Sequence, residues 1–193
     1  RLDGKYTLYP TDLVRMNADG SNRNVVFKSL ISSGSLWFRH VLQPSVSSAG
    51  NNVAVVSDGN SGTGIGVELH VINSRTGNMR KANVPSESQG QIRLGHNDPD
   101  FNSGGTKIAF TYNDSAGTEG SPRIGIFTCQ SKTNCSAGKT KLLRQSGYAN
   151  PSWSPNGTLL AVERTDGTGR DIAIVNARNG VERVRLTSDG DSF

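Results

Sequence analysis

The sequence holds few of the residue types from which catalytic and metal sites are usually built. Among 193 residues there are three histidines and two cysteines, and aromatic residues make up 6% of the chain. A metal site of the kind used by hydrolases and lyases needs several clustered nitrogen, sulfur or carboxylate ligands. His40, His70 and His96 stand far apart in the sequence. We therefore expect no metal site and no cofactor.

Long apolar runs and helical periodicity are also missing. No stretch is long or apolar enough to span a membrane, and no signal peptide is present, although a chain that starts at Arg1 leaves a removed leader open. The pentapeptide Gly-x-Ser-x-Gly of serine hydrolases does not occur. Short β-branched runs bounded by Gly, Asn, Asp and Ser recur instead, which predicts an all-β fold.

The charge balance is positive, with a formal net charge of +5. Such an excess is compatible with nucleic acid or an acidic membrane surface as a partner. Many of the cations, however, fall where an outer strand is expected, as Arg80, Lys141 and Arg183 do. Charged side chains on edge strands oppose sheet-to-sheet aggregation. Because no aromatic residues stand between these cations to stack bases, we expect no nucleic-acid partner.

The two cysteines, Cys129 and Cys135, are separated by a short polar segment. An isolated pair lacks the four ligands that a structural zinc needs. If the pair closes a hairpin, a disulfide fits, and a disulfide implies an oxidising compartment. Two reduced thiols on a loop are the alternative. The disulfide is favoured, so we expect a periplasmic or secreted protein.

The most informative stretch covers residues 150–157, Asn-Pro-Ser-Trp-Ser-Pro-Asn-Gly, which leads into an apolar run. Proline presets φ for the first corner of a turn and glycine reaches positive φ, so this stretch predicts a strand, a tight turn and a second strand. Two related stretches start at Pro44 and Pro99. In all three, glycine follows the first proline by six residues and alanine by ten. Pro44, Pro99 and Pro151 lie 55 and 52 residues apart, which indicates a repeat array.

Each repeat reads as four short antiparallel strands with no helix between repeats, as in the blades of a β-propeller. We expect one propeller segment of about three and a half blades. It consists of a partial blade at 1–33, full blades at 34–86, 87–144 and 145–187, and the start of another inner strand at 188–193. A propeller needs at least four blades to close, so the ring is incomplete. Either the chain is part of a longer propeller or two copies associate to complete a ring.

The third full repeat resembles the WD-like repeat of TolB-type propellers. The resemblance rests on Asn-Pro-Ser-Trp-Ser-Pro-Asn-Gly at 150–157, Leu-Ala-Val at 160–162, Asp-Ile-Ala-Ile-Val-Asn-Ala at 171–177 and Arg-Leu-Thr at 185–187. In the first two repeats Val46 and Phe101 replace Trp153, and the second proline is missing. The resemblance implies that these three residues pack in the cores between blades.

The ends of the inner strands line the central channel of a propeller. His96, Asn97 and Asp98 lead into one inner strand, and His40 precedes another. We therefore expect these four residues to contact a partner at the channel mouth. A metal-dependent lyase site at His96 is a minor alternative, because His40 and His70 fall elsewhere in their repeats.

A propeller supports many functions, so the fold alone does not select one. The resemblance favours a non-enzymatic module that binds a protein or peptide through its channel-mouth loops, with no catalytic residues. One alternative is the substrate-gating propeller of a prolyl-oligopeptidase-like serine peptidase. The other is a carbohydrate-active propeller similar to oligogalacturonide lyases.

Overall fold

The computed structural model describes residues 12–28, 31–32, 37–38, 41–57, 68–82, 96–113, 122–135, 137–165 and 169–188. These residues form antiparallel strands and contain no helix. In this part of the chain, nothing has the helical length and hydropathy needed to cross a lipid bilayer. The prediction of an all-β chain is confirmed.

Three four-stranded sheets follow one another along the chain, each with its strands in sequential order. The first contains β5 (Leu42–Val46), β6 (Asn52–Ser57), β7 (Glu68–Asn73) and β8 (Met79–Lys81). The second contains β9 (His96–Phe101), β10 (Lys107–Tyr112), β11 (Arg123–Cys129) and β12 (Gly138–Ser146). The third contains β13 (Tyr148–Trp153), β14 (Leu159–Thr165), β15 (Arg170–Asn176) and β16 (Glu182–Arg185). We call these sheets blades 1, 2 and 3.

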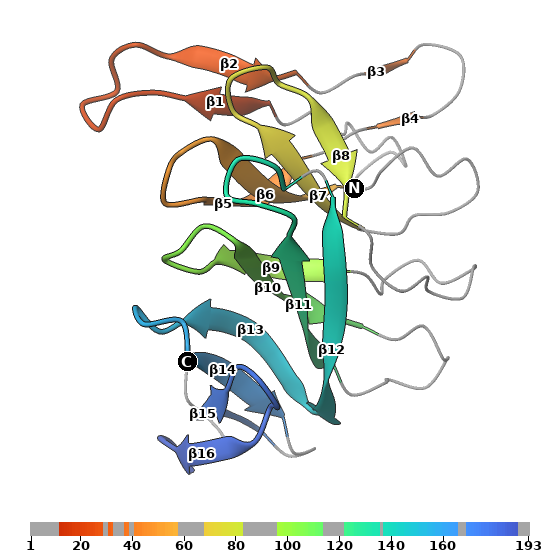
Figure 1. Ribbon diagram of the computed structural model, residues 1–193, viewed down its shortest axis with the longest axis vertical. Helices are drawn as coiled ribbons and strands as arrows, with labels where there is room; N and C mark the ends of the chain where they lie inside the picture. Colours follow the sequence, from red (N-terminus) through yellow and green to blue (C-terminus); the bar gives the residue numbers. More distant parts are fainter. Residues whose placement is uncertain are drawn as a thin grey trace, which may run out of the picture.

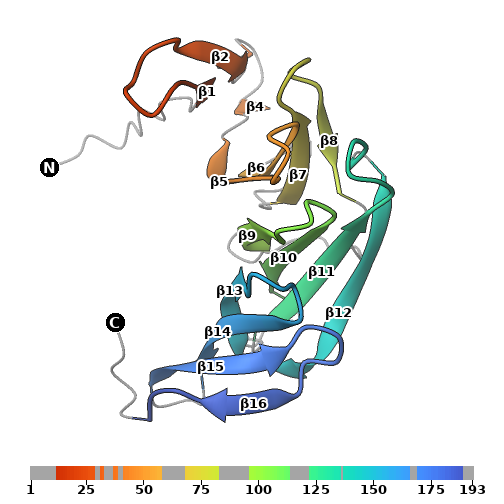
Figure 2. The same cartoon turned by 60° about the vertical axis from the view of Figure 1, so that its left-hand side comes forward.

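Two shorter pairs precede blade 1. β1 (Leu13–Arg15) pairs with β2 (Asn24–Phe27), and β3 (Ile31–Ser32) pairs with β4 (Trp37–Phe38). The turn between β1 and β2 closes with Gly20 N–H donating to Asn17 O, and the assignment of this pair to the second half of a partial blade stays a prediction. The sheets stack in an open arc (Figures 1 and 2), with β5, β9 and β13 along its concave side. The chain is an incomplete propeller ring, as predicted.

The repeated glycine is required by the turn between the first two strands of each blade. Gly50, Gly105 and Gly157 have φ values of 69°, 66° and 68°. Each donates its N–H to the carbonyl of the residue three positions earlier, over 2.7–2.9 Å. A side chain at this φ is strained, whereas glycine adopts it freely.

The repeated alanine faces the next blade. Ala54 packs in one core with Phe101, Ile108 and Phe110 of blade 2. Ala109 packs in a second core with Leu160 and Val162 of blade 3. A small side chain at this position lets the neighbouring sheet approach closely. A third core, around Val53 and Val55, joins blade 1 to the β1–β2 pair through Leu13 and Val26.

The three expected core residues have different surroundings. Phe101 is 7% exposed, and the partly buried Trp153 packs against the core between blades 2 and 3. Val46 is 56% exposed, so the prediction that it is a core residue is wrong. Phe101 and Trp153 pack toward the preceding blade, and the structure describes no inner strand in the blade that precedes Val46. Val46 therefore lacks the equivalent partner within the described residues.

The predicted disulfide is confirmed and closes the hairpin between β11 and β12. Cys129 and Cys135 are bonded, with their Cα atoms 4.5 Å apart. The bridged loop contacts blade 1, because the side-chain amides of Asn51 and Asn52 donate to Lys132 O over 3.3 and 3.1 Å. The disulfide thus stabilises a loop that links two blades.

Candidate functional site

The same backbone irregularity interrupts all three inner strands. Gln43, Asp98 and Asn150 have φ values of 50°, 52° and 51°, and each immediately precedes the repeat proline of its strand. The strand register shifts at these positions in all three blades. An extra residue in one strand is a β-bulge, a feature that re-aims side chains and is common near functional sites. The bulges bring a polar residue to the same place in every inner strand.

The bulge residues of blades 1 and 2 bind each other. The Gln43 side-chain amide donates to Asp98 Oδ1 over 2.6 Å, and the Asp98 backbone N–H donates to Gln43 Oε1 over 2.9 Å. This reciprocal pair fixes the Gln43 side chain along the backbone of the neighbouring strand. It also holds the carboxyl group of Asp98 in one orientation.

The bulge residue of blade 3, Asn150, makes its own polar contacts beside the Gln43–Asp98 pair. Asn150 donates its backbone N–H to Thr111 Oγ1 over 2.9 Å and its side-chain amide to Glu163 Oε2 over 2.5 Å. Glu163 also forms an ion pair with Arg170, with Nη1 and Oε1 2.7 Å apart. We call Gln43, Asp98, Asn150 and Glu163 the inner-strand strip.

The strip carries two interacting carboxyl groups. Burial raises the pKa of Asp98 above its ordinary value of 3.8, and the negative charge of Glu163 raises it further. Asp98 and Glu163 come from adjacent blades, so the two acids meet across an inter-blade boundary. Carboxylates in such a strip accept hydrogen bonds from N–H donors and attract cationic side chains. Within the described ranges, no three metal-ligating side chains converge.

Backbone contacts next to the strip hold the inner strands in place. Asp100 Oδ2 accepts the backbone N–H of Trp153 over 2.8 Å, and Asp100 O accepts the indole Nε1–H over 3.0 Å. In the same way, Ser45 Oγ accepts the backbone N–H of Phe101 over 3.0 Å. In blades 1 and 2, the residue after the repeat proline thus binds the next inner strand. The strip is built on a rigid support.

One residue of this strip was predicted from the sequence. Asp98 belongs to it, whereas His96 and Asn97 are placed in β9 opposite Tyr112 and Thr111, and His40 lies outside the described residues. Gln43, Asn150 and Glu163 were not predicted. A usable signal was present, because a residue with a side-chain amide or carboxyl group precedes the repeat proline in all three copies. The partner contacts predicted for His96, Asn97, Asp98 and His40 stay predictions.

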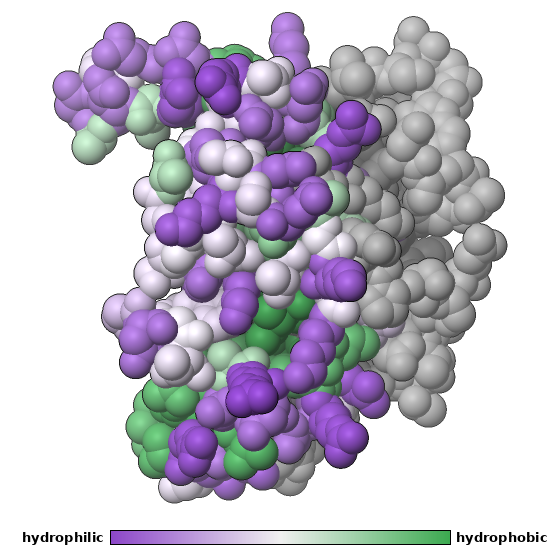
Figure 3. Space-filling model, in the orientation of Figure 1, coloured by the Kyte–Doolittle hydropathy of each residue, from purple (hydrophilic) through white to green (hydrophobic). Residues whose placement is uncertain are grey.

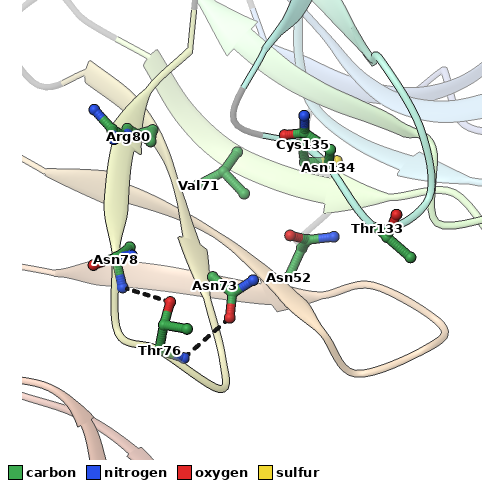
Figure 4. Close-up of a pocket in the computed structure, with 9 residues that line it drawn as sticks. All are labelled: Asn52, Val71, Asn73, Thr76, Asn78, Arg80, Thr133, Asn134 and Cys135. Atoms are coloured by element: carbon green, nitrogen blue, oxygen red, sulfur yellow. Dashed lines mark hydrogen bonds between the residues drawn. The ribbon is translucent and has the colours of Figure 1, made fainter.

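A polar groove of about 260 Å³ lies between blade 1 and the disulfide hairpin of blade 2. Figure 4 shows Asn73, Thr76 and Asn78 along one side and Thr133 and Asn134 on the other.

Several polar atoms of this groove already have partners. Asn73 Oδ1 accepts the backbone N–H of Thr76, and the Asn52 amide donates to Lys132 O. These contacts shape the turns and the hairpin. They leave fewer groups to bind a ligand.

No protein-family model and no curated protein matches the sequence. Solved structures do match in fold. TolB from Acinetobacter baumannii aligns with a TM-score of 0.61 and 19% identity over 91% of this chain and 37% of its own. The putative TolB from Agrobacterium tumefaciens aligns with a TM-score of 0.59 and 17% identity over 90% of this chain and 52% of its own. A prolyl endopeptidase aligns with a TM-score of 0.62 and 16% identity over 93% of this chain and 26% of its own.

The chain spans about a third to a half of the TolB structures. At such low identity, the similarity defines the architecture and leaves the activity open. The repeated four-stranded sheets, the open arc and the matching structures together show that this chain has a TolB-like β-propeller fold.

Proposed function

We propose that the chain is a non-enzymatic propeller module that binds a protein or peptide partner at the concave side of the arc. The inner-strand strip is the observation that supports this proposal. Bulges at Gln43, Asp98 and Asn150 place polar groups at one level of three neighbouring strands. The inter-blade hydrogen bonds of Asp100 and Ser45 fix that arrangement before a partner arrives. Preorganisation of this kind lowers the entropic cost of binding.

The chemistry of the strip suggests what a partner brings to it. Asp98 and Glu163 supply carboxyl oxygens, and Gln43 and Asn150 supply amide groups. A peptide backbone offers both N–H donors and carbonyl acceptors, and so matches a row of mixed amides and carboxyls. A lysine or arginine on the partner would add an ionic contact to Glu163 or Asp98. The expected ligand is thus an extended peptide segment with a basic residue.

Peptide selection from a phage-displayed library tests the proposal. Enriched peptides are expected to carry Lys or Arg and to lose about tenfold or more in affinity when Glu163→Gln and Asp98→Asn are combined. Arg15→Gln with Lys28→Gln, two exposed positions at the β1–β2 pair, is the control and should leave affinity unchanged. Failure to enrich any peptide, or equal loss with the control, would count against binding at the strip.

We also propose an extracytoplasmic location, periplasmic or secreted. The Cys129–Cys135 disulfide supports it, because disulfides persist in oxidising compartments and are rare in the cytosol. Alkylation of free thiols in intact cells, followed by mass spectrometry, checks this. The protein isolated from its natural source should resist alkylation until a reductant is added. Immediate labelling of both cysteines would contradict the proposal.

A further inference from the structure

A second inter-blade groove lies between blades 2 and 3, where the chain turns from β15 to β16. It encloses about 510 Å³ and has a floor of buried apolar side chains, Ile126 and Ala177. Three cationic residues, Lys107, Lys141 and Arg178, line it. Figure 3 shows hydrophobic surface in a hollow between β12 and the last blade, with hydrophilic side chains on its flanks.

This groove occupies the place in blades 2 and 3 that the polar groove occupies in blades 1 and 2. Lys141 lies opposite Ile126 on neighbouring strands, as Arg80 lies opposite Val71 in blade 1. Lys107 lies opposite Thr128, in the position that Asn52 holds opposite Asn73.

The two equivalent grooves differ in charge. The lining of the first contains one cationic residue, Arg80, whereas that of the second contains three; neither includes a carboxylate. The second groove therefore has a concentrated positive charge that the fold itself does not require, because the first groove forms without it.

The cations of the second groove have no acidic partner among the described residues. The ion pairs found there involve other residues, at Arg164, Arg170 and Arg185. Lys141 Nζ donates to the backbone carbonyl of Arg178 over 2.8 Å. This contact holds the lysine at the groove without neutralising its charge. Like charges placed together without counter-charges repel one another, and an anionic partner relieves that repulsion.

We propose that the groove binds an acidic peptide segment of a partner protein. The three cations attract carboxylates, while the apolar floor accommodates a hydrophobic side chain beside them. Thr128, Thr158 and Asn176 border the same space and offer hydrogen bonds to a peptide backbone. No aromatic residue lines the groove. A platform for stacking nucleobases is therefore missing, which favours a peptide over a nucleic acid.

Fluorescence anisotropy with a labelled peptide of alternating glutamate and leucine residues tests this proposal. A peptide in which glutamine replaces glutamate serves as the neutral probe. The wild-type protein should bind only the acidic peptide, and the affinity should fall steeply with added salt. The triple variant Lys107→Gln, Lys141→Gln, Arg178→Gln should lose at least about tenfold in affinity for the acidic peptide. Failure of the wild type to bind overturns the proposal.

A second triple variant separates the groove from general charge attraction. Arg15→Gln, Arg23→Gln and Arg75→Gln remove the same charge from exposed positions outside the groove and should change affinity by less than about twofold. Equal weakening in both triples overturns the proposal. So does tighter, groove-dependent binding of a sulfated oligosaccharide or a single-stranded oligonucleotide. Peptide binding at the inner-strand strip is tested with Glu163→Gln and Asp98→Asn, which lie outside this groove. The proposal for the strip and the proposal for the groove can therefore fail independently.

Discussion

A glycine in the middle of a strand illustrates how closely the blades are packed. Gly125 of β11 lies opposite Phe110 of β10, and the aromatic ring covers the place where a side chain would begin. Phe110 is fully buried and sits in the core between blades 1 and 2. The ring cannot move aside without opening that core.

We expect Gly125→Ala to lower the free energy of unfolding by about 2 kcal/mol, as overpacking of a core typically does. Gly104→Ala is the control, because the nearest atom to its added methyl group is the side-chain nitrogen of Asn102, at 3.2 Å, in a partly exposed turn. Urea denaturation of both variants measures the difference. Equal stabilities would show that the Phe110 ring adapts.

The raised pKa of Asp98 predicts a pH dependence of stability. The folded protein binds a proton at this carboxyl more readily than the unfolded chain does. Protonation of Asp98 therefore stabilises the fold. This contribution to stability is complete below the ordinary pKa of 3.8 and is lost as pH rises through the raised pKa. Asp98→Asn removes this loss while keeping an acceptor for Gln43. Its stability relative to the wild type should therefore increase as the pH rises above 3.8.

Asp19 provides a control of opposite sign. Hydrogen bonds from the side chain and backbone of Ser21 lower the pKa of Asp19, so its contribution is lost as pH falls. Relative to the wild type, Asp19→Asn should lose stability as the pH rises toward 3.8 from below. Thermal melting at several pH values measures both trends. Parallel curves for the two variants would contradict the assignment at Asp98.

At the scale of elements, the disulfide hairpin joins blade 2 to blade 1. We expect the double variant Cys129→Ser, Cys135→Ser to lose about 2 kcal/mol of stability, the entropic contribution of closing a short loop. A reductant should destabilise the wild type by a similar amount. It should leave the variant unaffected, so the variant controls for any other effect of the reductant. Chemical denaturation with and without reductant gives both numbers. A variant as stable as the oxidised wild type would show that the hairpin needs no bridge.

Most strands were predictable because turn residues mark their ends. β9 ends before Asn102, β10 lies between the turn at Gly105 and Asn113, and β11 begins after Pro122. β12 extends to Ser146, because its polar residues pair with β11 across a register shift that no local pattern reveals. The disulfide followed from the spacing of two cysteines. The exact blade boundaries stay predictions.

The candidate site was less predictable than the fold. A residue before proline normally favours an extended backbone, so the positive φ of Gln43, Asp98 and Asn150 runs against the local preference. Hydrogen bonds between blades stabilise this conformation, and such partners are distant in sequence. Glu163 lies in an ordinary β14 stretch, and only the fold brings it to Asn150.

At the scale of the whole molecule, blade 3 has one face that no other blade among the described residues covers. In blade 2 the central strand residues are buried on both sides, whereas β14 and β15 alternate between buried and partly exposed residues. Ala161, Ile174 and Val184 lie side by side on the less buried face, and Val184 is 47% exposed. Ala161 is the counterpart of Ala54 and Ala109, which face the next blade.

We therefore propose that copies of this chain associate through this face at micromolar concentration. Ile174→Lys should reduce the average mass seen by light scattering toward that of one chain, because a charge opposes burial of the face. Met16→Lys, at a position that is 61% exposed and directly follows β1, is the control and should leave the mass unchanged. A wild-type protein that stays monomeric over the whole concentration range would contradict the proposal.

The repeated alanine face also determines how the molecule loses its structure. Each blade contacts its neighbours through the same kind of surface, so unfolding resembles the opening of a short stack, in which the outermost unit has one interface to lose and the inner units have two. At the blade 3 end, fraying should start at β16 and progress toward blade 2, with amide hydrogen exchange slowing along that path. Local opening at this end would then expose apolar surface well before the chain unfolds as a whole.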